Sequence, residues 1–246
     1  MPLKTAKSKQ PIKEFLPAAF KLQLEKEEKE REQRRKLSDG PGRYLRAPQE
    51  TTNEKSGKLE PGAVEFRVLS DAVFGWTLWY ETAEGGRACK RWLAEELLEM
   101  GIEGGNVPPS MLPDKYEKYA KSGNPKISKC LSMVVYNITE SSKTETDVFQ
   151  IWDLDKVTMM EQFSAACSST NFGYPTAYDF VWTRVGQGTS TKHTLQPQPP
   201  YELPEEILDA YLALGVNLKA HAAGRPLDEV WSDIQKREDT DAEVPF

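Results

Sequence analysis

The sequence predicts a mainly β fold built from short strands. Segments rich in β-branched and aromatic residues recur from Val64 onward, and glycine-rich or polar turns separate them. A single helical pattern interrupts the late strands. Short strands with one helix between the late ones are typical of a small β-barrel of the OB type. We therefore expect such a barrel, with an inserted loop, flanked by helical and disordered terminal segments.

The strands are expected to follow one another along the chain. They cover residues 64–70, 73–80, 87–92, 130–138, 147–154, 178–185 and 189–195. The fourth and fifth should form a hairpin across ESSKTET at 140–146, and the last two should pair through the GQG turn at 186–188. In the second strand, alternation puts Trp76 and Tyr80 on one face and Trp79 on the other. At least one large aromatic side chain must therefore face outward.

Helical patterns lie between and after these strands. LAEELLEM at 93–100 predicts a short helix, and the Gly/Pro-rich stretch 101–126 predicts an inserted loop over the strands. Asp155 is expected to cap a helix that carries apolar residues at helical spacing. PEEILDAYLALG at 204–215 and RPLDEVWSDIQK at 225–236 predict two further helices, which would dock on the barrel or mediate self-association.

The charge is polarised along the chain. Residues 1–57 hold 14 Lys and Arg against 9 Asp and Glu, residues 58–200 hold 14 against 18, and residues 201–246 hold 4 against 11. This division predicts four parts. They are a basic and charged-helix N-terminal arm with a linker (1–57), the barrel domain (58–200), C-terminal helices (201–238) and an acidic tip (239–246).

Cysteine usage and hydropathy indicate the cellular compartment. Cys89, Cys130 and Cys167 are an odd number with no close pairing, which fits a reducing compartment better than a disulfide scaffold. The sequence has no run of roughly 18 apolar residues, the length that a membrane span needs. We therefore expect a cytoplasmic protein with no membrane partner.

Candidate catalytic and metal-binding patterns are weak. The three cysteines and His193 lack the CxxC or HxxxH spacing of a zinc site. Asp153 and Asp155 could be metal-binding carboxylates, although a strand end and a helix cap also explain them. GQG has neither the spacing nor the following helix of a phosphate loop, and there is no nucleophile elbow or HExxH motif. We expect no catalysis, no metal and no cofactor.

Aromatic side chains interleave with cations in the predicted strands. Outward aromatic rings beside guanidinium groups are the components of a platform on which single-stranded bases stack, while cations contact phosphates. The expected DNA-binding residues are Arg67, Trp76, Trp79, Tyr80, Arg87, Lys90, Arg91, Trp92, Trp152 and Arg184.

Three quoted stretches carry a family resemblance. They are GAVEFRVLSDAVFGWTLWYETAEGGRACKRW, VFQIWDLDKVTMMEQF and FGYPTAYDFVWTRVGQGTSTKHTLQPQPPYELPEEI. Their order resembles the single-stranded DNA-binding proteins of bacteriophages, a family with an OB-fold core, over roughly residues 58–210. The resemblance implies a protein that coats and protects single-stranded DNA during phage replication and recombination, in the host cytoplasm.

The final eight residues, DTDAEVPF, resemble the acidic tip of bacterial single-stranded DNA-binding proteins, which docks on replication and repair enzymes. A terminal Phe offers a partner an apolar anchor and a carboxylate, and the acids steer the encounter. The resemblance implies partner contacts from Asp239, Asp241, Glu243, Val244, Pro245 and Phe246.

Two other classes of function stay open. A protein-interaction scaffold with an OB-type core that does not bind DNA would fit the excess of acids in residues 58–200. A metal-dependent nuclease would use Asp153 and Asp155.

Overall fold

The computed structural model describes residues 42–52, 59–83, 85–186 and 190–231. The chain divides into two compact units, Met1–Gly42 and Arg43–Phe246. The N-terminal arm up to residue 41 and the acidic tip at 239–246 lie outside the described residues. Within the described ranges, no helix is long and apolar enough to cross a membrane.

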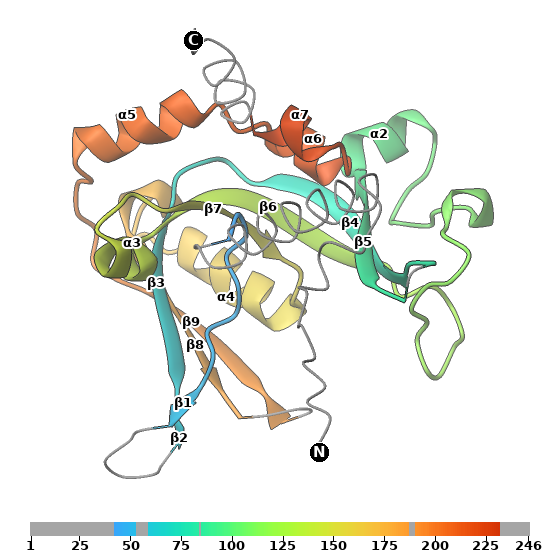
Figure 1. The fold of residues 1–246 in the computed structure, drawn as a ribbon, viewed down its shortest axis with the longest axis horizontal. Helices are drawn as coiled ribbons and strands as arrows, with labels where there is room; N and C mark the ends of the chain where they lie inside the picture. Colours follow the sequence, from blue (N-terminus) through green and yellow to red (C-terminus); the bar gives the residue numbers. More distant parts are fainter. Residues whose placement is uncertain (1–41, 53–58, 84, 187–189, 232–246) are drawn as a thin grey trace, which may run out of the picture. The chain divides into compact units, whose positions relative to one another are not determined.

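The second unit is built on antiparallel strands (Figure 1). Their bounds are β1 (Thr51–Thr52), β2 (Leu59–Glu60), β3 (Gly62–Val68), β4 (Val73–Glu81), β5 (Arg87–Leu93), β6 (Ser128–Asn137), β7 (Phe149–Leu154), β8 (Asp179–Val185) and β9 (Lys192–Pro197). β1 pairs with β2, and the other seven form one sheet in the order β5-β4-β6-β3-β8-β9, with β7 paired to β6. The predicted mainly β fold is confirmed, but this sheet does not close into a barrel.

Short helices connect and flank the strands. The α-helices are α2 (Ala94–Glu99), α3 (Ile138–Thr144), α4 (Val157–Cys167), α5 (Glu205–Leu214), α6 (Leu218–Ala222) and α7 (Leu227–Val230), and the 3-10 turns are η2 (Pro109–Met111) and η3 (Pro175–Ala177). Two local expectations were wrong. Helix α3 occupies the expected hairpin turn, because the Asn137 side chain accepts a hydrogen bond from the Glu140 N–H and so caps a helix. The cap of α4 is Lys156, without a side-chain hydrogen bond, and not Asp155.

Strands β3 and β4 lie one after the other along the same edge of β6. Val68 of β3 pairs with Val135, and Val73 of β4 pairs with Ser132. Between the two strands, the Ser70 hydroxyl accepts a hydrogen bond from the Val134 N–H at 2.9 Å. This backbone N–H of β6 therefore keeps a hydrogen-bond partner at the bend. The bend lets β3, β8 and β9 turn away from the β4–β5 end of the sheet.

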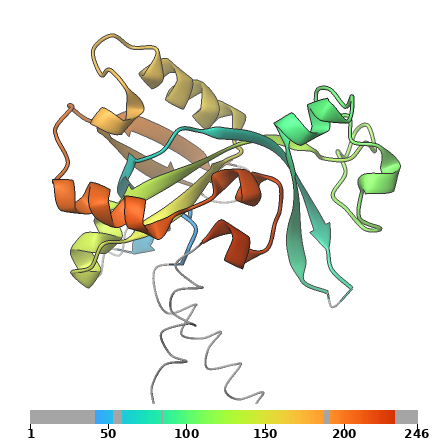
Figure 2. The same ribbon diagram turned by 90° about the horizontal axis from the view of Figure 1, so that it is seen from above.

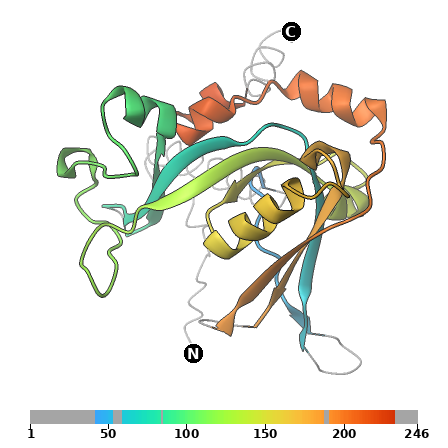
Figure 3. The same cartoon turned by 180° about the vertical axis from the view of Figure 1, so that it is seen from behind.

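Helix α4 packs into the concave side of the curled sheet (Figure 3). Phe163 of this helix meets the Trp152 ring edge-on at a centroid distance of 5.7 Å and lies 5.4 Å from Phe180. Its neighbour Gln162 bonds to β9: the Leu195 N–H donates to Oε1 at 2.6 Å, and Nε2 donates to the His193 carbonyl at 3.4 Å. Side-chain hydrogen bonds from α4 therefore cover the edge of β9, where a closed barrel would place another strand.

The C-terminal helices cover the other side of the β4–β6 part of the sheet, opposite α4 (Figure 2). Val230 and Trp231 join a second core cluster with Ile151 of β7. The segment just after Gly42 runs beside β7, where the Ile151 N–H donates to the Arg43 carbonyl at 2.8 Å. Part of the stretch expected to be a linker is thus ordered, because its Leu45 side chain has a place in the main core.

Candidate nucleic-acid interface

Both faces of the β4–β5 hairpin carry aromatic and cationic side chains. The register pairs Trp76 with Trp92, Trp79 with Cys89 and Glu81 with Arg87. The Trp79 side chain is 38% exposed, as alternation predicted for one aromatic of this strand. The Arg87 guanidinium carbon lies 4.8 Å from the centroid of the Trp79 ring, so a cation covers part of an exposed indole.

A segment of the loop between α2 and β6 extends this hairpin. The pairing of β4 with β6 ends at Thr77, and beyond it the loop takes over the same edge. The Glu117 N–H donates to the Trp79 carbonyl at 2.9 Å, and the Glu81 N–H donates to the Lys115 carbonyl at 3.3 Å. Backbone hydrogen bonds therefore fix the KYEKY sequence of the loop against the strand that carries Trp79.

Lysines and tyrosines of this loop join the side chains of the hairpin at one end of the sheet. Residues 112–129 contain five lysines against two acids, and all five lysines are exposed. Eight of the 14 cations in residues 58–200 lie in β5 and in residues 112–129, although residues 58–200 as a whole carry more acids. We call the following set, which spans both faces of the hairpin at this end of the sheet, the hairpin–loop surface: Trp79, Tyr80, Arg87, Lys90, Lys115, Lys118, Tyr119, Lys121 and Lys126.

Glu117 lies within this surface and pairs with two of its cations. Arg87 donates to the Glu117 carboxylate, and Lys126 Nζ lies 3.6 Å from its other oxygen. The side chains of Arg87 and Lys126 are 65% and 51% exposed. Because exposed ion pairs contribute little free energy, a phosphate group could replace Glu117 as the partner of either cation.

A small core holds the loop on the opposite face of the hairpin. Trp92 is buried there with Leu78, Leu97 and Val107, and the side chains of Tyr116 and Ile127 pack against them. This burial explains why the loop is ordered despite its glycines and prolines. It also removes Trp92 from the surface, so the expected contact of Trp92 with DNA has no support in the structure.

Two further predicted residues are inside the protein. Trp152 is 1% exposed and packs edge-on against Phe66 at a centroid distance of 4.8 Å. Arg67 is also 1% exposed: its Nε donates to Asp179 at 2.6 Å, and its Nη1 donates to the Tyr201 carbonyl at 2.9 Å. Both are structural side chains here, because neither a base nor a phosphate could reach them without opening the core.

The remaining predicted residues divide by position. Trp79 and Arg87 lie on one face of the hairpin and Tyr80 and Lys90 on the other, because cross-strand partners share a face, and all four belong to the hairpin–loop surface at this end of the sheet. Trp76 is half-buried on β4. Arg184 is half-buried on β8, and strands β4, β6 and β3 lie between β8 and β5 in the sheet.

Arg91 is committed to a polar cluster under the C-terminal helices. Its Nη2 donates to the Asp153 carboxylate at 2.6 Å, the Ser132 hydroxyl donates to the same group at 2.7 Å, and His221 Nε2 lies 2.9 Å from it. Burial alone would raise the pKa of Asp153, but the hydrogen bond with His221 and the charge of Arg91 outweigh it and hold the pKa well below its usual range. The cluster thus ties α6 to β5 and β7.

This cluster also bears on a metal-binding role for Asp153 and Asp155. Protein donors already occupy the Asp153 carboxylate, whereas Asp155 lies in a groove beside α4. Among the residues that the structure describes, no three His, Cys, Asp or Glu side chains are placed to share a metal ion. The geometry gives the paired-carboxylate interpretation no support.

The groove beside α4 has a volume of about 780 Å³. Trp76 and Lys129 line it from the strands, Tyr119 from the loop, and Met160 and Glu161 from α4.

Gly105 allows the loop to approach Trp76: a Cβ at this glycine would lie 2.5 Å from the indole Cε3. A glycine with φ near 73° is therefore required where the loop backbone crosses the ring.

Sequence reasoning missed the contribution of the loop to this surface. The Gly/Pro content of residues 101–126 drew attention to the breaks, although KYEKYAK at 115–121 alternates cations with aromatic rings in the same way as the strand residues. His221 was also missed, because no local pattern joins it to Asp153 across 68 residues. Neither the scan against protein-family models nor the search of curated proteins finds a match for this chain.

Proposed function

We propose that this protein binds single-stranded DNA through the hairpin–loop surface and coats it without catalysing a reaction. The observation that carries the proposal is the exposed Trp79 ring beneath Arg87, bordered by the loop lysines. Bases would stack on Trp79 and Tyr119, while Arg87, Lys90 and the lysines would neutralise phosphates. Stacking and charge contacts of this kind tolerate any sequence.

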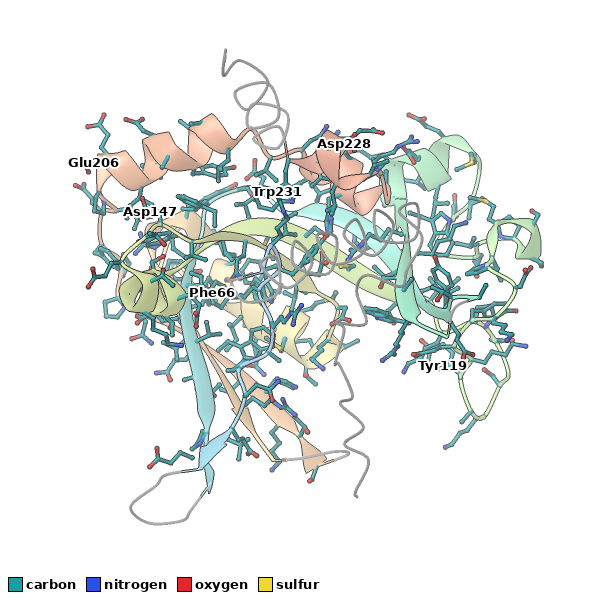
Figure 4. The ribbon with its side chains drawn as sticks, in the orientation of Figure 1. Phe66, Tyr119, Asp147, Glu206, Asp228 and Trp231 are labelled. Atoms are coloured by element: carbon teal, nitrogen blue, oxygen red, sulfur yellow. The ribbon has the colours of Figure 1, made fainter. Side chains whose placement is uncertain are left out.

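The distribution of charge indicates which end of the sheet the DNA strand would bind. The acids of α5 lie far from the hairpin–loop surface, as the positions of Glu206 and Tyr119 show (Figure 4). A polyanion is therefore attracted to the end of the sheet that carries the lysines and repelled from α5.

The family assignment forms part of the same proposal. The order of the quoted sequence phrases and the curled sheet with α4 between β7 and β8 are compatible with an OB-type core. On this basis we assign the protein to phage replication or recombination in the host cytoplasm, with partner enzymes recruited by the acidic tip.

A titration of a fluorescently labelled oligo-dT, followed by anisotropy at low salt, tests the proposal. Trp79→Ala should weaken binding by roughly tenfold or more, since stacking contributes about 1–3 kcal/mol per base. Tyr174→Ala is the matched control, because Tyr174 is a 66% exposed aromatic on the loop after α4 and lies outside the hairpin–loop surface. Absence of binding by the wild-type protein at low salt would refute the proposal.

A protein-interaction scaffold is the second candidate function. Helix α5 exposes two apolar side chains, Leu208 at 40% and Leu212 at 71%, next to acidic residues. Such a face suits a protein partner better than DNA. This alternative predicts a protein that ignores oligo-dT in the same titration.

A further inference from the structure

The groove beside α4 adjoins the hairpin–loop surface. Tyr119 belongs to both, and Lys129 stands opposite Trp76 in the register of β6 and β4. A strand of DNA that stacks on Tyr119 and follows the lysines would therefore reach the groove next. No second element has to move to give it access, because Tyr119 is 46% exposed and Lys129 is exposed.

The lining of the groove combines apolar walls with hydrogen-bond acceptors. Trp76 and Ile127 face Met160 and Val157 of α4, whose side chains recur along one face of that helix. The same lining includes the carboxylates of Asp155 and Glu161 as well as several serine hydroxyls. The groove is thus suited to a flat group with an apolar face and a hydrogen-bond donor at its edge.

The carboxylates decide which flat group fits. They repel phosphate, so the sugar-phosphate backbone should stay at the mouth of the groove near Lys129. A carboxylate accepts hydrogen bonds from the exocyclic amino group of cytosine or adenine. Thymine presents only one ring N–H between two carbonyl oxygens, which face a carboxylate unfavourably.

We infer that the groove between α4 and the hairpin–loop surface holds bases of the bound strand and favours bases with an exocyclic amino group over thymine. The inference rests on the proposed function, since a strand that stacks on Trp79 reaches the groove, on the other face of β4, by passing over the loop at Tyr119. It assigns the acids of the groove to base selection, and the lysines of the hairpin–loop surface to affinity.

Paired titrations with oligo-dC and oligo-dT of about 20 nucleotides, longer than the site of one OB fold, test this inference. The wild-type protein should bind oligo-dC about fivefold more tightly, at the lower end of the discrimination expected from base contacts because the groove is open. The double variant Asp155→Asn, Glu161→Gln should lose this preference and bind oligo-dT at least as tightly as wild type, because it no longer repels phosphate and the thymine carbonyls. Glu206→Gln on α5 is the matched control and should keep the preference.

A variant that fills the groove gives a second readout. Ala165 is exposed on α4 and lines the groove, so Ala165→Trp should abolish the preference for oligo-dC without disturbing the core. Thr158→Trp, at an exposed position of α4 outside the groove, should leave the preference intact. Equal binding of the two oligonucleotides by a wild-type protein that remains sensitive to Trp79→Ala would overturn the inference alone. Failure to bind either oligonucleotide would overturn the proposed function as well.

Discussion

Arg87 lies over the exposed ring of Trp79, with 4.8 Å between the guanidinium carbon and the ring centroid. The two residues come from neighbouring strands, and the guanidinium also pairs with Glu117 of the loop. One cation thus links the strand that carries the aromatic ring to the segment that carries the lysines. A base that stacks on Trp79 would bring its phosphate close to Arg87 and to the exposed lysines.

Substitution of the two tryptophans should separate binding from folding. Trp79→Ala removes an exposed ring and should weaken binding to oligo-dT with little change in the free energy of unfolding. Trp92→Ala empties part of the small core under the loop and should cost about 3–5 kcal/mol in urea denaturation. Equal unfolding midpoints for the two variants would contradict the positions described for these rings.

The salt dependence of DNA binding should identify the cations that contact phosphates. Each cation lost from the hairpin–loop surface, as in Arg87→Gln or Lys121→Gln, should flatten the plot of log affinity against log salt by about 0.7. Lys143→Gln on α3 is the control, because Lys143 is exposed but lies elsewhere and pairs with Glu140. If the double variant Arg87→Gln, Lys121→Gln keeps the wild-type slope, the DNA path lies on another part of the protein.

Strand positions could be predicted from the sequence because β-branched and aromatic alternation is a local signal. The expected pairings of β6 with β7 and of β8 with β9 are confirmed. The open edge of the sheet could not be predicted in this way. It depends on Gln162 bonding to Leu195 across the fold, and no short pattern encodes such a contact.

The candidate site shows the same division between local and distant information. Strand alternation predicted that Trp79 or its neighbours must face outward, and Trp79 does. Arg67 and Arg91 are of a residue type that contacts DNA, and they lie in strands rich in aromatic residues. Their acidic partners, Asp179 and Asp153, lie 112 and 62 residues away in the sequence. A cation that pairs with a distant acid in the fold cannot be distinguished by composition from one that faces solvent.

The Asp153 cluster should make folding depend on acidity. Asp153→Asn leaves Arg91 without its carboxylate partner and should cost about 3 kcal/mol at pH 7, as expected for a largely buried pair. Because the folded pKa of Asp153 lies below its ordinary value of 3.8, its contribution is complete above that value and declines as pH falls below it. The difference between wild type and variant, measured by urea denaturation, should therefore shrink at pH 3. A constant difference from pH 7 to pH 3 would argue against the shift.

Gly105 should be more sensitive to substitution than another glycine of the same loop. Both Gly105 and Gly123 have positive φ, so an alanine at either position should cost about 1 kcal/mol in backbone strain. At Gly105 the new methyl group would also collide with the Trp76 ring, whereas the space around Gly123 is open. Gly105→Ala should thus destabilise the protein more than Gly123→Ala and shift the Trp fluorescence. Equal unfolding free energies would mean that the ring can move aside at no cost.

The acidic tip should compete with DNA for the lysines. Residues 201–246 hold 11 acids against 4 cations, and long-range attraction between this segment and the hairpin–loop surface weakens as salt rises. Deletion of Asp239–Phe246 should therefore tighten DNA binding at low salt, with a smaller effect at high salt, and abolish recruitment of a replication or recombination partner.

Removal of Phe246 alone should separate the two roles of the tip. The acids remain, so DNA affinity should barely change, but the apolar anchor is removed, so partner binding should be lost. A pull-down from host lysate with wild-type and Phe246-deleted protein, together with anisotropy on oligo-dT, measures both effects. Identical sets of captured proteins would show that the terminal phenylalanine anchors no partner, and the tip would then act on DNA binding through its charge alone.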